Sequence, residues 1–188
     1  GLACLTLAIV LLAVLRQTSA AQPAGTEGGA AGQSAALPTA AAPHEGPPYT
    51  IAIDAGHGGT DIGAEGVINE IQLTEATIGY LEGWLTQDEN YTSVRTHAAD
   101  TFSKNTERAA AANSAGASLL LSVHGNSDPY SSDSYGLECY PQPPGRTHHA
   151  DSLRLAHLIA DKFGAAGQRL RGNAGVRYIY YAGDDESG

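Results

Sequence analysis

The sequence lacks methionine and holds only two cysteines, one tryptophan and two phenylalanines in 188 residues. Without an initiating methionine, Gly1 is not a natural start, so we expect a fragment that is open at both ends. Cys4 lies in an apolar run and Cys139 in an expected strand, so a disulfide between them is not expected. Two isolated cysteines also exclude a metal site built on a CxxC motif.

Positive charge is scarce as well. The sequence has 10 Lys and Arg against 20 Asp and Glu, which is a formal net charge of -10. No stretch is rich in Lys or Arg, whereas the phosphates of nucleic acids require clustered cations. We therefore expect no nucleic-acid partner, and solubility alone explains the acidic surface.

Only one long apolar run occurs, from Leu2 to Leu15, and it is shorter than the ~20 residues that span a bilayer. Small residues follow it, so residues 1–21 are expected to be a signal peptide or a membrane anchor. A buried core helix is the other reading, but the run has no amphipathic face. Residues 22–48 are rich in Ala, Gly and Pro and predict a disordered linker. The protein is therefore expected outside the cell or in its envelope, meeting the membrane only through its N-terminal segment.

From residue 49 to residue 188, apolar strand patterns alternate with helical ones. Strands are expected at residues 51–54, 91–95, 118–123, 136–140 and 176–181. Helices are expected to open at Glu70, to run over 105–115, and to include 153–163. This alternation predicts a single α/β domain, with a mainly parallel or mixed twisted sheet covered by helices on both faces.

Two histidines stand where expected strands end. His57 follows the first strand and His124 ends the strand over 118–123. Ligands of α/β sheets bind beyond the carboxyl ends of strands, so both side chains point toward one rim. Glu70 opens a helix, where the helix dipole favours a carboxylate. Two imidazoles and a carboxylate are a hydrolytic zinc set. From the spacing alone, ordinary hydrogen-bonding roles for these three residues are as well supported as metal binding.

The amino-acid sequences around these residues favour the metal-binding interpretation. The stretch IAIDAGHGGTDIGA, residues 51–64, resembles the opening motif of the zinc-dependent N-acetylmuramoyl-L-alanine amidases of the type 3 family. NEIQL around Glu70, SVHGN around His124 and GLE ending at Glu138 resemble the later motifs of that family, in the same order. Val94-Arg95-Thr96 matches the family's Thr-Arg strand only loosely. The resemblance covers about residues 49–181.

The resemblance implies that His57, Glu70 and His124 bind one Zn2+ ion. It also implies a peptidoglycan hydrolase that cuts the amide between N-acetylmuramic acid and the L-alanine of the stem peptide with zinc-activated water. The family has a catalytic Glu on a late strand, and nothing in this sequence matches that strand. We expect the catalytic Glu beyond Gly188, so this fragment should bind zinc weakly and hydrolyse poorly.

Three further residues are candidates for supporting the site. Asp61 either orients a ligand histidine or forms a turn. Asn126 is expected to hold the loop after His124. Glu138 either lines the substrate groove or is an exposed strand residue. Two other functions stay open: a wall-binding module without turnover, and another zinc hydrolase such as a deacetylase.

Other polar residues are expected to have no part in the site. His97 is expected in a surface loop, and His148 and His149 are expected in solvent. Arg108 and Asn113 are expected to form a structural hydrogen-bonding pair.

Overall fold

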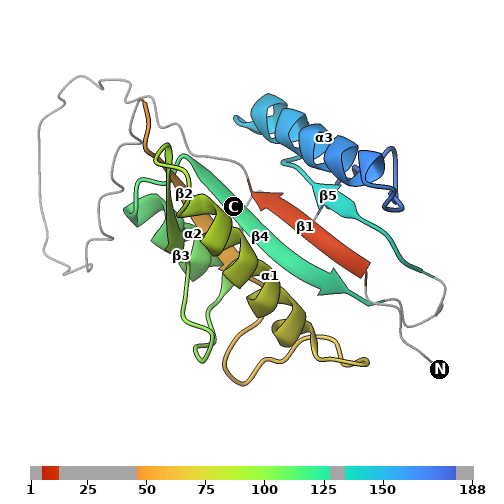
Figure 1. Cartoon of the computed structure of the whole chain (residues 1–188), viewed down its shortest axis with the longest axis horizontal. Coiled ribbons are helices and arrows are strands. Elements are labelled where there is room, and N and C mark those ends of the chain that lie inside the picture. The colour runs from red at the N-terminus through yellow and green to blue at the C-terminus, as the bar shows by residue number, and fades with distance from the viewer. Residues whose placement is uncertain (1–5, 13–45, 128–133, 181–188) are drawn as a thin grey trace, which may run out of the picture.

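The computed structural model describes residues 6–12, 46–127 and 134–180. Five strands form one sheet in the order β3-β2-β4-β1-β5 (Figure 1). The strands are β1 (Thr6–Leu12), β2 (Tyr49–Ala55), β3 (Tyr91–Arg95), β4 (Leu119–Asn126) and β5 (Glu138–Tyr140). The helices are α1 (Glu70–Leu85), α2 (Asn105–Ser114) and α3 (His149–Ala165).

The sheet is mixed. β2 pairs in parallel with β3 on one side and with β4 on the other. β1 runs antiparallel to β4 and parallel to β5, so it separates these two strands. The predicted α/β class with a mainly parallel or mixed sheet is confirmed. Because β2 and β4 are parallel, their carboxyl ends meet at one edge of the sheet.

Helices cover both faces of the sheet because alternate strand residues point to opposite sides. Ile53 and Val123 pack with Ile78 of α1 on one face. Ala52 and Leu120 pack on the other face, in a cluster that includes Ala112 of α2. The third cluster joins β5 to α3 through buried Cys139, Ala156 and Ala160. Cys139 and Val123 both oppose Ile9 in register, which places α1 and α3 on the same face.

Part of the apolar N-terminal run is in the sheet. Residues 6–12 form β1, and their content of Thr, Ile and Val suits a strand. The role of residues 1–21 as a signal or anchor stays a prediction; residues 1–5 and 13–21 lie outside the described ranges, as does the expected linker up to residue 45. Among the described residues, no helix is both long enough and apolar enough to cross a bilayer.

The strand expected over 176–181 is wrong for the residues that the structure describes, which end at 180. Val176 makes two isolated bridges, a parallel one to Cys139 and an antiparallel one to Asn173. The ladder there consists of Cys139 N–H donating to Gly175 and Arg177 N–H donating to Cys139. The next donor along β5 would be residue 141, which is Pro141 and has no N–H. The pairing therefore stops after one residue.

Candidate metal centre

His57 is held at the end of β2 by a tight, glycine-rich turn. Its φ of 73° is in the left-handed region, and the loop that follows returns to it through Gly63. A Cβ on Gly63 would lie 2.6 Å from the His57 ring and 2.7 Å from Glu70, so only glycine fits there. The Nδ1 atom of His57 lies 3.0 Å from the Asp61 carboxylate, and Nε2 lies 3.0 Å from Glu70. Asp61 thus lies against one ring nitrogen while the other faces Glu70, a position from which it can orient the ring.

Glu70 is the first residue of α1, where its carboxylate receives several donors. The backbone N–H of Ala64 donates to Oε2 at 3.0 Å, and that of Gly125 donates to Oε1 at 2.8 Å. Nδ1 of His124 lies 3.2 Å from Oε1. Burial alone would raise the pKa of Glu70, but these hydrogen bonds and the nearby His57 outweigh it and lower the pKa to about 2. Glu70 is therefore an anion at neutral pH.

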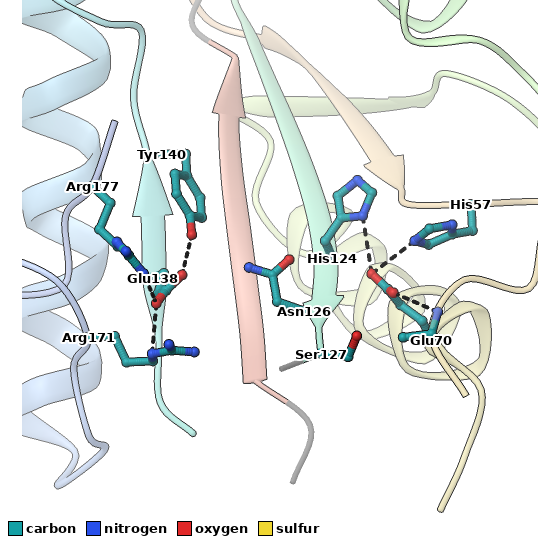
Figure 2. Close-up of a pocket in the computed structure, with 10 residues that line it drawn as sticks. His57, Glu70, His124, Asn126, Ser127, Glu138, Tyr140, Arg171 and Arg177 are labelled. Atoms are coloured by element: carbon teal, nitrogen blue, oxygen red, sulfur yellow. Dashed lines mark hydrogen bonds and ion pairs between the residues drawn. The ribbon is translucent and has the colours of Figure 1, made fainter. Parts of the chain in front are cut away.

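His57, Glu70 and His124 converge, although they come from three different elements (Figure 2). Each offers a ligand atom, and these atoms lie within 4.8 Å of one another. Ligands about 2.0–2.1 Å from a tetrahedral zinc lie roughly 3.3 Å apart. The Glu70 oxygen lies 3.0 Å from one imidazole nitrogen and 3.2 Å from the other, which is close to that spacing. The group can hold a metal ion, and the donor set fits zinc.

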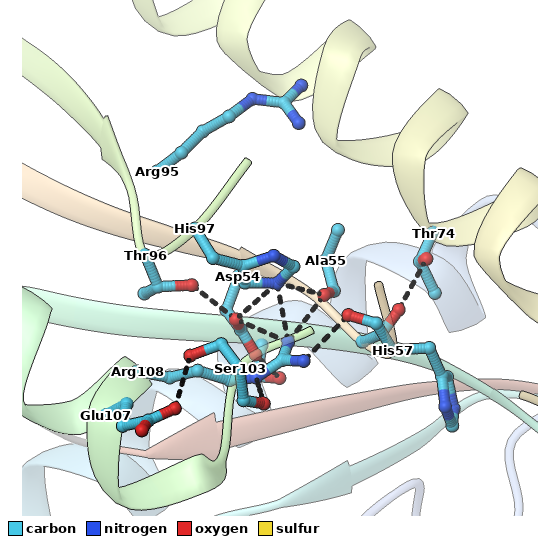
Figure 3. A network of polar contacts seen from close by, with 12 residues as sticks. Asp54, Ala55, His57, Thr74, Arg95, Thr96, His97, Ser103, Glu107 and Arg108 are labelled. Carbon is cyan, nitrogen blue, oxygen red and sulfur yellow. Dashed lines mark hydrogen bonds and ion pairs between the residues drawn. The ribbon is translucent and has the colours of Figure 1, made fainter. Parts of the chain in front are cut away.

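A buried arginine holds the turn that presents His57 (Figure 3). Arg108 of α2 donates from Nη2 to the His57 carbonyl at 2.7 Å and from Nη1 to the Ala55 carbonyl at 2.7 Å. The same Nη1 lies 2.9 Å from the Asp54 carboxylate, which also accepts from Thr96 and Ser122. One guanidinium therefore ties α2 to the end of β2, and no buried side-chain nitrogen or oxygen in the described ranges lacks a partner.

The far side of the same pocket is built around Glu138. One side of the pocket is lined by the three metal candidates, Asn126 and Ser127. The other side is lined by Glu138 and Tyr140 of β5 and by Arg171 and Arg177 of the segment after α3. Figure 2 shows these two sides separated by β1. Glu138 is 1% exposed, so its expected alternative as an exposed strand residue is wrong. It is buried because Arg171, Arg177 and the Tyr140 hydroxyl neutralise and bond it.

Most of the site residues predicted from the sequence lie on the pocket lining. The structure brings His57, Glu70 and His124 together, sets Asp61 against His57, and places Asn126 and Glu138 on the pocket lining. Whether each performs the role assigned to it stays a prediction.

Other assignments were wrong. His97 was expected at the surface, but its side chain is only 4% exposed, with Nε2 2.7 Å from Arg108. Arg108 pairs with Asp54 rather than with Asn113. His148 is buried rather than in solvent. The sequence does not predict a pocket role for Arg171, because a lone arginine after a helix carries no local signal for one.

Comparison with known proteins decides the family. A family model described as N-acetylmuramoyl-L-alanine amidase matches residues 51–181. The chain belongs to this family. The matched residues include the turn of His57, the helix start at Glu70, the strand of His124, and Glu138. The protein is therefore an N-acetylmuramoyl-L-alanine amidase by family, and the substrate of that family is peptidoglycan.

Solved structures agree with this assignment. The amidase is similar to the catalytic domain of CwlV from Bacillus (Paenibacillus) polymyxa var. colistinus, with 30% identity, a TM-score of 0.57 and 71% of each chain covered. It is also similar to an N-acetylmuramoyl-L-alanine amidase from Clostridium difficile 630, with 26% identity, a TM-score of 0.61, and 70% of this chain and 69% of that one covered. AmiC2 of Nostoc punctiforme shares 25% identity at a TM-score of 0.55, with 71% of each chain covered. No curated protein matches the chain.

Proposed function

We propose that the amidase uses a zinc ion held by His57, Glu70 and His124 to hydrolyse the amide between N-acetylmuramic acid and L-alanine. The observation that supports this most is the convergence of the three ligand atoms within 4.8 Å on the wall of an open pocket. Zinc bound there would polarise the scissile carbonyl and lower the pKa of a water molecule toward ~7. An imidazole ligand contributes no charge, so Glu70 would supply the single negative charge of the three ligands.

The protein's own residues preorganise the ligands. Asp61 fixes the ring of His57, and the N–H groups of Ala64 and Gly125 fix the carboxylate of Glu70. The Arg108 guanidinium holds the His57 carbonyl, which sets the direction of the side chain. A site whose ligands are already oriented binds metal without ordering them first, so it holds the ion more tightly.

Proton transfer needs a further group. The carboxylates that line the pocket, in the ranges that the structure describes, are Glu70 and Glu138. Glu70 belongs to the ligand set, and Glu138 is bonded to two arginines and a tyrosine. Neither is placed to accept a proton from water. This observation supports the expectation of a separate catalytic Glu, and it also favours the second candidate, a module that binds cell wall without turnover.

The metal assignment is tested by zinc content and amine release. With zinc in excess, so that a weak site is filled, we expect one zinc per chain in the wild type. His124→Ala should lose most of this zinc, because one of three ligands is gone. The matched control is His157→Ala, an exposed histidine on α3 that should keep its zinc. Equal zinc content in the two variants would refute the ligand assignment.

The same proteins separate the two functions. Peptidoglycan is incubated with each protein, and free amine in the supernatant and protein in the pellet are both measured. Amine release that depends on His124 supports hydrolysis, whereas pelleting without any amine release supports the binding module.

We also propose that the amidase is exported by residues 1–21, as a signal or an anchor, and acts at the cell wall. Retention of this segment keeps β1 (residues 6–12) in the sheet, whereas its cleavage would remove that strand. The substrate class of the amidase supports export, because peptidoglycan amidases act on the wall. Fusing residues 1–48 to a reporter that is active only outside the cytoplasm tests it. Reporter activity in the medium indicates a cleaved signal, activity in the membrane fraction indicates an anchor, and no activity refutes export.

A further inference from the structure

The cluster around Glu138 is richer in cations than one buried carboxylate requires. Nε of Arg171 lies 2.8 Å from Oε1, and Nη1 of Arg177 lies 2.9 Å from the same oxygen. The Tyr140 hydroxyl donates to the other oxygen. One arginine would neutralise Glu138, so the second leaves the cluster with a net charge of about +1. Burial first, and then the bond to Glu138, raise the pKa of Tyr140 to about 12, so its hydroxyl stays a neutral donor.

Arg171 has donors to spare. In the part of the chain that the structure describes, its side-chain contact with Glu138 engages Nε and leaves the two terminal nitrogens uncommitted. Its side chain is 24% exposed and lines the pocket, so these nitrogens are open to a ligand. Figure 2 shows the guanidinium extending from the β5 side toward β1 and the metal candidates. A guanidinium fork whose one edge is held by a buried carboxylate is preorganised to bind a second anion.

The sheet register sets the separation between this cluster and the metal candidates. Ala8 of β1 opposes His124 on one side and Glu138 on the other. His124 and Glu138 therefore face the same way across two strand spacings, roughly 10 Å apart at Cα. An extended peptide advances about 3.3–3.6 Å per residue. Because the Arg171 side chain extends toward β1, its guanidinium can contact a substrate group that lies about two residues beyond the scissile amide.

The chemistry of the substrate says which group that is. In N-acetylmuramoyl-L-alanine the lactyl carboxyl of the sugar is consumed in the amide, and the N-acetyl group is neutral. Free carboxylates therefore lie on the amine side of the scissile bond, in the stem peptide. We propose that Arg171, supported by Arg177 and Glu138, binds a free carboxylate of the stem peptide. This inference rests on the proposed amide hydrolysis in one respect, namely that the amine side of the scissile bond faces Arg171.

The test compares two ligands that differ in one charge, N-acetylmuramoyl-L-alanyl-glycine and its C-terminal carboxamide. Affinities for the full zinc-loaded chain are measured by calorimetry, and kcat/KM replaces Kd wherever amine release shows cleavage. We expect the wild type to prefer the acid by about 10- to 100-fold, the range for a charge-assisted hydrogen bond. Arg171→Gln should reduce this ratio to near one while leaving carboxamide binding within about twofold.

Three further variants sharpen the result. Arg171→Lys should keep part of the preference, because it retains the charge without the fork. Arg177→Gln should lower the preference and serves as the test if Arg171→Gln does not fold. Arg154→Gln, an equally drastic change at an exposed arginine of α3, should leave the preference unchanged.

Several outcomes would overturn the proposal. The first is a wild type that binds both ligands alike or binds neither. The second is a preference for the acid that survives in both Arg171→Gln and Arg177→Gln. The third is an equal loss of affinity for acid and carboxamide in these variants, which a structural role predicts. Failure of the proposed hydrolysis looks different. It would abolish zinc-dependent amine release and leave the acid-to-carboxamide affinity ratio intact.

Discussion

Arg108 offers a quantitative test of what holds the metal-presenting turn. Its side chain is 7% exposed and bonds Asp54, the Ala55 carbonyl and the His57 carbonyl. Arg108→Ala would leave the 5%-exposed Asp54 carboxylate without its cation. Removing one partner of a buried pair costs about 3–5 kcal/mol, a large part of the 5–15 kcal/mol that stabilises a typical domain.

A second arginine provides the matched control. Arg95 also bonds two carboxylates, Glu75 at 2.6 Å and Glu82 at 2.7 Å, but its side chain is 31% exposed. Solvent screens such pairs, so Arg95→Ala should cost about 1 kcal/mol or less. The two substitutions remove the same side chain, with one ion pair at Arg108 and two at Arg95. A larger cost at Arg108 would therefore come from the burial of its ion pair and from its bonds to backbone carbonyls, not from the number of ion pairs.

The assay is urea unfolding at pH 7 with a chelator present, so that metal binding does not add to stability. The midpoint should fall far more in Arg108→Ala than in Arg95→Ala, with the slope m unchanged in both. Arg108→Lys should fold but bind zinc more weakly than the wild type, because an ammonium cannot hold Asp54 and the His57 carbonyl together. Equal costs for the two alanine variants, or full zinc affinity in Arg108→Lys, would refute the reasoning.

Two other predictions concern titratable groups. The pKa of Glu70 is lowered from 4.5 to about 2 in the fold, so the stability it contributes, up to about 3 kcal/mol, is present above pH 4.5 and lost as the pH falls toward 2. Unfolding at pH 7, 5 and 3 should show this loss in the wild type and not in Glu70→Gln; identical pH profiles would contradict it. Burial raises the pKa of Cys139 to about 12, so iodoacetamide should label it only after unfolding. Rapid labelling of Cys139 in the native protein at pH 8 would show that β5 and α3 do not pack as described.

The elements were predictable where local chemistry determines them. Asn69 is the residue before α1, and its backbone N–H donates to the Gln72 side chain at 2.9 Å, while the glycine at position 116 has a φ of 62° just beyond α2. Apolar runs such as that of β4 predict buried strands. The turn at His57 and the family motif around it were equally visible, because they are contiguous in the chain. The strand predicted from residue 176 is absent over the described residues 176–180 because Pro141, in the chain it would pair with, has no N–H to donate.

By itself, the sequence determined the class of fold, the family and the three metal candidates, because periodicity and contiguous motifs encode them. The tertiary structure alone decided which polar side chains share a buried environment. Glu138 is buried because two arginines from the segment after α3 reach it, and His97 is buried because Arg108 lies against it. Such pairings depend on which strands and helices are neighbours in space, and no local pattern in the chain records that.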